Sequence, residues 1–225
     1  MLRYDLGIFN EATSKTPLEN VAWVARIEFT PTMLGFKPES KTTGRGWLHD
    51  TRLGKKGDVL TIGLSYYNQE VYNANANKEI DVDGYNVDVF LEKKFGNALL
   101  NLEGAYTYFN DSHLVSKAGT WKKEDSYFWY LQGQIMYDCV VGIGKPALYL
   151  KYEYMEADSM YQNKDYEMNR WAVGVNYYIV GNAARLTVGL DNVNYDDGAS
   201  DYLKANNKNK EDNITDIYVQ AQIMF

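Results

Sequence analysis

The feature that most constrains the fold is a two-residue hydrophobic period that recurs along the whole chain. Apolar and polar side chains alternate over ten segments, and successive side chains of an extended strand point to opposite faces of its sheet. Each segment therefore has one apolar face and one polar face, whereas helical periodicity is nowhere convincing. The predicted strands are 2–9, 21–30, 58–67, 84–95, 97–109, 126–138, 146–156, 168–180, 184–194 and 214–225.

Two all-β architectures share this alternation. A soluble sandwich or barrel buries its apolar rows in a core and leaves its polar rows in water. A transmembrane antiparallel β-barrel turns its apolar rows to lipid and its polar rows to a lumen. Most of the predicted strands exceed the usual ~5–6 residues of a globular sheet and reach the ~9–11 residues that cross a bilayer. We therefore predict one transmembrane barrel domain over residues 1–225.

Connection lengths and aromatic positions favour the same architecture. Connections 96–97, 139–145 and 181–183 are short, whereas 68–83, 110–125, 157–167 and 195–213 are long and polar. Short periplasmic turns, long external loops and aromatic girdles at both interfaces are typical of membrane barrels. Segment 31–57 is long where a short turn is expected, so we expect it to cover a pore mouth or a neighbouring chain. The strand-end aromatic residues are Tyr66, Tyr85, Tyr106, Tyr108, Tyr127, Tyr152, Tyr154 and Trp171 at one end, and Phe29, Phe95, Tyr137, Tyr177 and Phe225 at the other.

Average composition conceals this pattern and excludes several functions. The mean hydropathy is −0.46, because every second residue of a barrel strand faces the lumen and dilutes the apolar signal. A pI near 4.9 argues against nucleic-acid binding. His49 and His113 have no partners at zinc-ligand spacing, and Ser112 beside His113 lacks the acid of a catalytic triad. We predict no enzyme activity, no catalytic residues, no cofactor and no metal.

The polar rows supply candidate pore-lining residues of both signs. They allow two interpretations, either mutually paired wall charges or a set that biases ion permeation. A basic run in segment 31–57 would likewise attract anions at a pore mouth or form a solvated loop; it comprises Lys37, Lys41, Arg45, Arg52, Lys55 and Lys56. The pore-lining candidates are Arg3, Asp5, Arg26, Glu28, Asp88, Glu103, Lys151, Glu153, Arg170, Arg185 and Asp191.

Three stretches resemble the bacterial outer-membrane porins, in particular the phosphate-selective porin O and P family. They are "LRYDLGIFNEATSKTPLENVAWVARIEFTP" (2–31), "GDVLTIGLSYYNQ" (57–69) and "DIYVQAQIMF" (216–225). The resemblance implies that the chain is the C-terminal part of a sixteen-stranded outer-membrane barrel. A homotrimer is one possible assembly of such a barrel. It also implies passive diffusion of small hydrophilic solutes or ions, anions such as phosphate among them. The family's selectivity residues lie mostly in an unmatched N-terminal half, so none is transferred.

The last strand resembles the signal that barrel assembly machinery recognises, with Val219, Ala221 and Ile223 at alternate positions and a terminal Phe225. We therefore expect a native C-terminus, with any missing strands at the N-terminus. The expected partners are outer-membrane lipid and lipopolysaccharide, the assembly machinery, and small solutes or ions. Two alternatives stay open, namely a narrow outer-membrane barrel whose external loops bind a partner and a soluble β-sandwich binding module.

Overall fold

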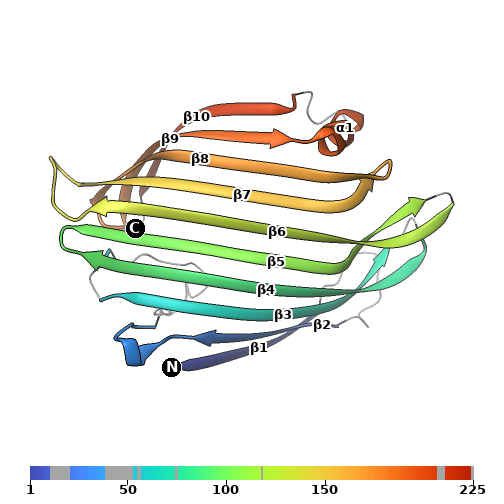
Figure 1. Ribbon diagram of the computed structural model, residues 1–225, viewed down its shortest axis with the longest axis horizontal. Coiled ribbons are helices and arrows are strands. Elements are labelled where there is room, and N and C mark those ends of the chain that lie inside the picture. Colours follow the sequence, from blue (N-terminus) through green and yellow to red (C-terminus); the bar gives the residue numbers. More distant parts are fainter. Residues whose placement is uncertain are drawn as a thin grey trace.

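In a computed structural model, the chain forms one sheet of ten antiparallel strands in sequence order (Figure 1). The structure describes residues 1–10, 21–38, 53–54, 57–73, 76–117, 119–206 and 211–223. The all-β prediction is confirmed, because every predicted strand is present and pairs with its neighbours in the chain. The strands are β1 (Leu2–Asn10), β2 (Val21–Phe29), β3 (Val59–Asn73), β4 (Lys78–Phe95), β5 (Ala98–Lys117), β6 (Thr120–Tyr137), β7 (Lys145–Tyr161), β8 (Lys164–Val180), β9 (Ala184–Tyr195) and β10 (Asn213–Ile223).

The two ends of the sheet differ in their connections. The turns β4–β5, β6–β7 and β8–β9 lie at one end together with the start of β1 and the end of β10, and we call this the short-turn end (Figure 1). The hairpins β3–β4, β5–β6 and β7–β8 lie at the opposite end, which we call the hairpin end. The described pairings form a linear series, so β1 and β10 are the two edges of the sheet.

The prediction of long loops at the hairpin end was wrong for three of the four connections. Segments 68–83, 110–125 and 157–167 mostly continue the strands, which leaves four residues or fewer between β3 and β4, between β5 and β6, and between β7 and β8. In the β7–β8 turn, Gln162 and Asn163 both have positive φ, as two-residue hairpin turns that match the strand twist require. The apolar row ends before these extensions while the backbone pairing continues, so the hydrophobic pattern located only the inner part of each strand.

The fourth connection contains a helix that the periodicity did not predict, α1 (Asp197–Ala205). The Asp196 carboxylate caps it by accepting a hydrogen bond from the Ala199 backbone N–H at 2.8 Å. The ring of Tyr202 packs edge-on against Tyr161 and Tyr166 of the β7–β8 hairpin. A single turn of 3₁₀ helix, η1 (Thr32–Leu34), follows β2. In the part of the chain that the structure describes, no helix has both the length and the apolar character to cross a membrane.

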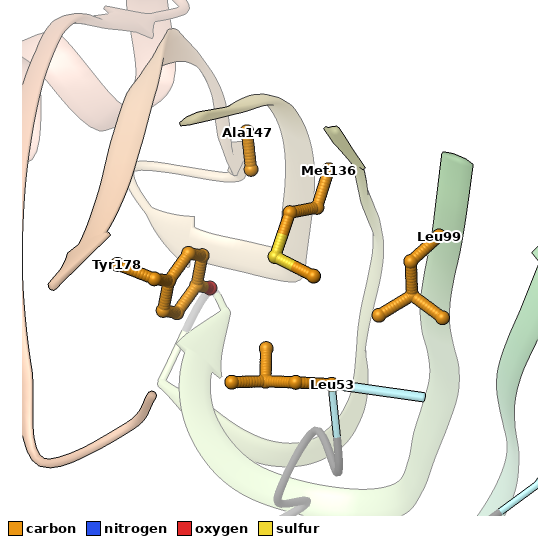
Figure 2. Packing of buried hydrophobic residues seen from close by; sticks show 5 residues of the cluster. All are labelled: Leu53, Leu99, Met136, Ala147 and Tyr178. Carbon is orange, nitrogen blue, oxygen red and sulfur yellow. The ribbon is translucent and has the colours of Figure 1, made fainter. Parts of the chain in front are cut away.

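The buried apolar cluster is small and lies at the short-turn end (Figure 2). Four of its members come from strand termini, whereas Leu53 comes from the connection between β2 and β3. In Figure 2 the Leu53 side chain points between Met136 and Tyr178. The cluster consists of Leu53, Leu99, Met136, Ala147 and Tyr178.

Candidate functional site: the two faces of the sheet

The pairing registers place all the predicted apolar rows on one face of the sheet, which we call the apolar face. Leu148 of β7 lies opposite Ile135 of β6 and Val175 of β8. Each of the other neighbouring strand pairs likewise sets its apolar rows side by side. These side chains are largely uncovered, with exposed fractions of 77% at Leu6, 60% at Leu150 and 76% at Val219. The exposed apolar area extends over all ten strands, far more than the isolated apolar patches of a soluble monomer.

The opposite face, which we call the polar face, carries the better-buried charged groups. Asp88 is 8% exposed and Glu92 is fully buried. A soluble protein shows the reverse arrangement, because charged groups are seldom fully buried and apolar groups form the core. The distribution of burial in this sheet is therefore inverted.

An aromatic belt crosses the apolar face near the hairpin end. Tyr66, Tyr85, Tyr108 and Tyr127 are consecutive cross-strand partners from β3 to β6. The ring of Trp23 on β2 contacts that of Tyr66, with 5.0 Å between the ring centroids. The ring of Trp129 on β6 contacts that of Tyr152 on β7 and so extends the belt to β7. The predicted gathering of aromatic residues at this end is thus confirmed in the register.

Several tyrosine hydroxyls of the belt, and that of Tyr154 beside Trp129, donate to carboxylates. Tyr66 donates to Asp83 at 2.5 Å, and Tyr154 donates to Glu167 at 2.9 Å. Tyr127 and Tyr154 share Glu156. Each of these rings therefore presents an apolar body to the apolar face and a polar tip to an acidic neighbour, an arrangement suited to an apolar–aqueous boundary.

All eleven predicted pore-lining residues occupy the polar face, as their pairing shows. Asp5 lies opposite Arg26, Glu103 lies opposite Gln132, and Glu153 lies opposite Arg170. The structure brings most of them together in two clusters and leaves the others near the sheet edges or in a polar pocket. The placed residues are Arg3, Asp5, Arg26, Glu28, Asp88, Glu103, Lys151, Glu153, Arg170, Arg185 and Asp191.

The first cluster centres on Arg26 of β2, which reaches across β3 to Asp88 of β4. Two hydrogen bonds of 2.5 and 2.9 Å join the guanidinium to the carboxylate, and a third of 3.0 Å reaches Ser65. Gly63 lies beneath this bridge, and a Cβ there would be 2.3 Å from Arg26 Nη2 and 2.5 Å from Asp88 Oδ2. The missing side chain at Gly63 is what lets the ion pair span the intervening strand.

The second cluster joins β7, β8 and β9. Arg170 Nε donates to both carboxylate oxygens of Asp191, at 2.8 and 3.1 Å, while its Nη1 donates to Glu153 at 3.2 Å. Lys151 approaches the other oxygen of Glu153 at 2.7 Å. Ala172, which pairs with both Lys151 and Asp191, is small enough to leave room above it.

Four further candidates have different partners. Glu103 accepts hydrogen bonds from Tyr130 at 2.6 Å and from Gln132 at 2.8 Å. Arg3 pairs with Asp5 on the same edge strand at 3.0 Å. Arg185 donates to the amide oxygen of Gln222 at 2.8 Å and lies over the ring of Tyr178.

The candidate set has five basic and six acidic members, and four of the five basic side chains lie beside carboxylates. The polar face therefore offers many hydrogen-bonding groups with little excess of either charge. Such a surface can form hydrogen bonds with polar molecules and has little net charge to attract ions of one sign.

Leu53 and Gly54 belong to segment 31–57, which the sequence places at a pore mouth or a neighbouring chain without singling out either residue. Leu53 packs into the apolar cluster, and the Gly54 backbone N–H donates to Glu92 at 3.0 Å. The segment thus crosses the polar face at the short-turn end. No periodic signal singles out Leu53, a lone apolar residue in a basic stretch. Of that basic run, Lys37 bridges to Val59, and Lys41, Arg45, Arg52, Lys55 and Lys56 lie outside the described residues.

The predicted assembly signal occupies the apolar face of the edge strand β10. Val219, Ala221 and Ile223 lie opposite Val188, Leu186 and Ala184 of β9. Gln222 faces the other way and receives the hydrogen bond from Arg185. Phe225 lies outside the described residues.

His113 and Ser112 connect the outer hairpins. Ser112 Oγ is 2.8 Å from His113 Nδ1, and His113 Nε2 is 2.8 Å from the backbone carbonyl of Asp158. A carbonyl can only accept, so Nε2 donates in this contact. Ser112 Oγ also donates to the backbone carbonyl of Glu124 at 3.2 Å. The pair ties the β5–β6 hairpin to the β7–β8 hairpin. Among the described residues, no cluster of three histidine, cysteine or acidic side chains is arranged to hold a metal ion.

Comparison with known proteins found no match, neither to a family model nor to a curated protein.

Proposed function

We propose that this protein is an outer-membrane porin, a passive diffusion channel for small hydrophilic solutes or ions. The observation that carries the proposal is the inverted burial of the sheet. Exposed apolar rows suit contact with lipid, and a buried, hydrogen-bonded polar face suits the wall of a water-filled lumen.

The dimensions of the apolar face support this proposal. On β6 the apolar row runs from Tyr127 to Tyr137, a separation of about 33 Å along a strand at ~3.3 Å per residue. At the ~35–45° tilt of membrane barrels this length spans about 25 Å, the height of the lipid-facing band of such barrels. The tyrosine–carboxylate belt would then lie at the outer interface.

The proposed mechanism is solvation of the solute by the polar face. Paired charges and amide side chains replace part of the hydration shell and so lower the barrier to crossing. The near balance of charge on this face favours weak ion selection over strong anion selection. Selectivity for anions such as phosphate, which the resemblance implies, is a finer proposal that needs separate measurement.

In a membrane the two edge strands of the sheet, β1 and β10, need hydrogen-bonding partners. Lipid offers no hydrogen-bonding groups, so an unpaired strand edge is not tolerated in the bilayer core. We propose that β1 and β10 are joined either to each other or through further strands, as in the expected sixteen-stranded barrel. The bacterial outer membrane, its lipid and lipopolysaccharide, the barrel assembly machinery and a homotrimeric assembly belong to the same proposal.

The position of Leu53 favours a second candidate, a narrow barrel whose outer hairpins bind a surface partner. Leu53 and its cluster occupy the polar face at the short-turn end, where they would restrict a narrow lumen. The soluble β-sandwich has no comparable support, because its apolar rows would need a cover that the ten paired strands do not provide.

Two measurements test these proposals. Heat-modifiable migration on a gel, with extraction only by detergent, is expected for a membrane barrel, and a stable monomer in detergent-free buffer would contradict it. Conductance steps in a planar bilayer, recorded with salts of unequal ion size, are expected for a channel and would report its ion preference. A detergent-dependent barrel without conductance would favour the second candidate.

A further inference from the structure

Two side chains of β5 tie the β5–β6 hairpin to the β7–β8 hairpin. His113 Nε2 lies 2.8 Å from the backbone carbonyl oxygen of Asp158 on β7. Lys117 donates to Ser159 Oγ of β7 at 2.7 Å and also forms an ion pair with Glu124 of β6. Both ties reach past β6, which lies between β5 and β7 in the sheet.

The tie through His113 is a chain of three polar contacts. Ser112 Oγ is 2.8 Å from His113 Nδ1 and 3.2 Å from the backbone carbonyl oxygen of Glu124. The other ring nitrogen, Nε2, supplies the third contact, to the carbonyl oxygen of Asp158. We call the chain formed by Ser112, His113 and these two carbonyl groups the histidine clasp.

The number of protons in the clasp depends on the charge of His113. Both carbonyl oxygens can only accept, so Nε2 must donate at one end and the Ser112 hydroxyl at the other. With a neutral imidazole, the Nε2 proton and the hydroxyl proton serve three contacts, and one contact has no hydrogen. An imidazolium donates from both ring nitrogens, so Nδ1 then donates to Ser112 while Ser112 donates to the Glu124 carbonyl. Only the charged ring supplies a hydrogen to every contact of the clasp.

The charged side chains around the clasp are mostly acidic. They are Asp111 and Lys117 of β5, Lys122, Lys123, Glu124 and Asp125 of β6, Glu156 and Asp158 of β7, and Asp165 of β8. Two of these three lysines already pair with an acidic side chain. Burial, followed by the nearby carboxylates of Asp165 and Glu156, raises the pKa of Asp158. A positive charge on His113 is attracted by this surplus of negative charge.

We propose that the histidine clasp is a pH-sensitive fastening between the two hairpins. Protonation of His113 adds one hydrogen bond to the closed arrangement, so the hairpins resist local opening more strongly as the pH falls and lose this resistance as the pH rises. Histidine is the side chain that ordinarily changes charge between about pH 5 and 8. The clasp is a property of the folded chain, whereas its consequence for permeation rests on the proposed function: in a channel these hairpins surround the outer mouth, which becomes more mobile at higher pH.

Amide hydrogen exchange on the detergent-folded full chain tests the clasp at about pH 5.5 and about pH 8, on either side of the histidine titration. Each rate is divided by the intrinsic rate of an unstructured chain at the same pH. Protection of residues 110–117 and 157–163 is expected to be about three- to ten-fold higher at the lower pH, the effect of one hydrogen bond. The inner parts of the same strands, residues 98–104 and 145–150, should show no such difference.

Three variants separate His113 from the surrounding carboxylates. The chain has two histidines, so His49→Gln is a matched control that should keep the full pH dependence. In His113→Gln the amide still donates to the Asp158 carbonyl and accepts from Ser112, but it cannot take up a proton. Its protection should stay at the low value at both pH values. Ser112→Ala keeps the histidine and removes the link to Glu124, and it should reduce the pH effect to less than about two-fold.

Two results would overturn the clasp. An equal pH effect in the parent protein and in folded His113→Gln would assign the effect to the carboxylates, and higher protection at the higher pH would reverse the expected sign. Single-channel recordings at both pH values test the consequence for permeation, since current noise should increase at the higher pH. Unchanged noise in a conducting protein would refute that consequence. A protein without conductance that keeps the pH-dependent exchange would refute the channel and leave the clasp intact.

Discussion

Leu150 offers the sharpest test of which medium the apolar face meets. It lies on β7, between Gly133 of β6 and Val173 of β8, and 60% of it is exposed. Its row is flanked by Tyr152 toward the hairpin end and by Pro146, opposite Tyr177, toward the short-turn end. Leu150 is therefore near the midplane of the proposed lipid band. Because 60% of Leu150 is exposed, a longer arginine side chain can extend away from the sheet there.

The substitution Leu150→Arg separates the two environments by its magnitude. An exposed leucine in water tolerates the change within about 0.5 kcal/mol, whereas arginine on the lipid face at the midplane costs about 2–4 kcal/mol. The free energy of unfolding in phospholipid vesicles, from urea titration followed by tryptophan fluorescence and gel migration, is expected to fall by the larger amount.

A matched variant controls for the chemistry of the substitution. Ile143 lies in the β6–β7 turn and is 73% exposed, so Ile143→Arg should cost only about 0–1 kcal/mol near the interface. If both variants fall within about 0.5 kcal/mol of the parent protein, the apolar face does not meet lipid and the proposed function loses its main support.

Three further outcomes are expected. Gly63→Ala should lower the unfolding free energy by about 2 kcal/mol, because the added Cβ displaces the Arg26–Asp88 ion pair. This is less than the ~3–5 kcal/mol of a broken buried pair, since the Arg26 side chain is 25% exposed. In an Asp88→Asn background Gly63→Ala should cost less, and an equal cost there would refute the displacement of the ion pair. Hydrogen bonds from Lys145 and Lys94 hold the pKa of Asp138 below its ordinary 3.8, so its contribution to stability is present above pH 3.8 and is lost as the pH falls through the lower folded value. The difference in unfolding free energy between the parent protein and Asp138→Asn should therefore become smaller as the pH falls below 3.8. A difference that stays constant would show that Asp138 does not stabilise the protein through these two lysines. Leu53→Ala should lower the unfolding free energy by about 2–3 kcal/mol through lost packing and should raise single-channel conductance. Ile143→Ala, at the same end of the sheet, should leave conductance unchanged. A destabilised Leu53→Ala protein with unaltered conductance would show that Leu53 does not restrict the lumen.

The sequence alone determined the ten strands and the two faces. Side-chain direction alternates with every residue of a strand, a consequence of backbone geometry that needs no knowledge of the neighbours. The predicted rows, such as Leu148 and Leu150 or Lys151 and Glu153, therefore share faces once the strands pair. The boundaries at the short-turn end were also predictable, because glycine and polar residues interrupt the apolar row there.

The tertiary structure decided which side chains meet on each face and how far the strands continue. The hairpin extensions depend on pairing between polar segments, which carries no hydrophobic signal. The bridge from Arg26 to Asp88 depends on Gly63 of a third strand, and the polar pocket beside Arg185 combines residues from six strands. Leu53 reaches its cluster from a connection whose path only long-range packing sets. Local periodicity encodes the direction of a side chain, whereas its partners depend on chain segments far apart in the sequence.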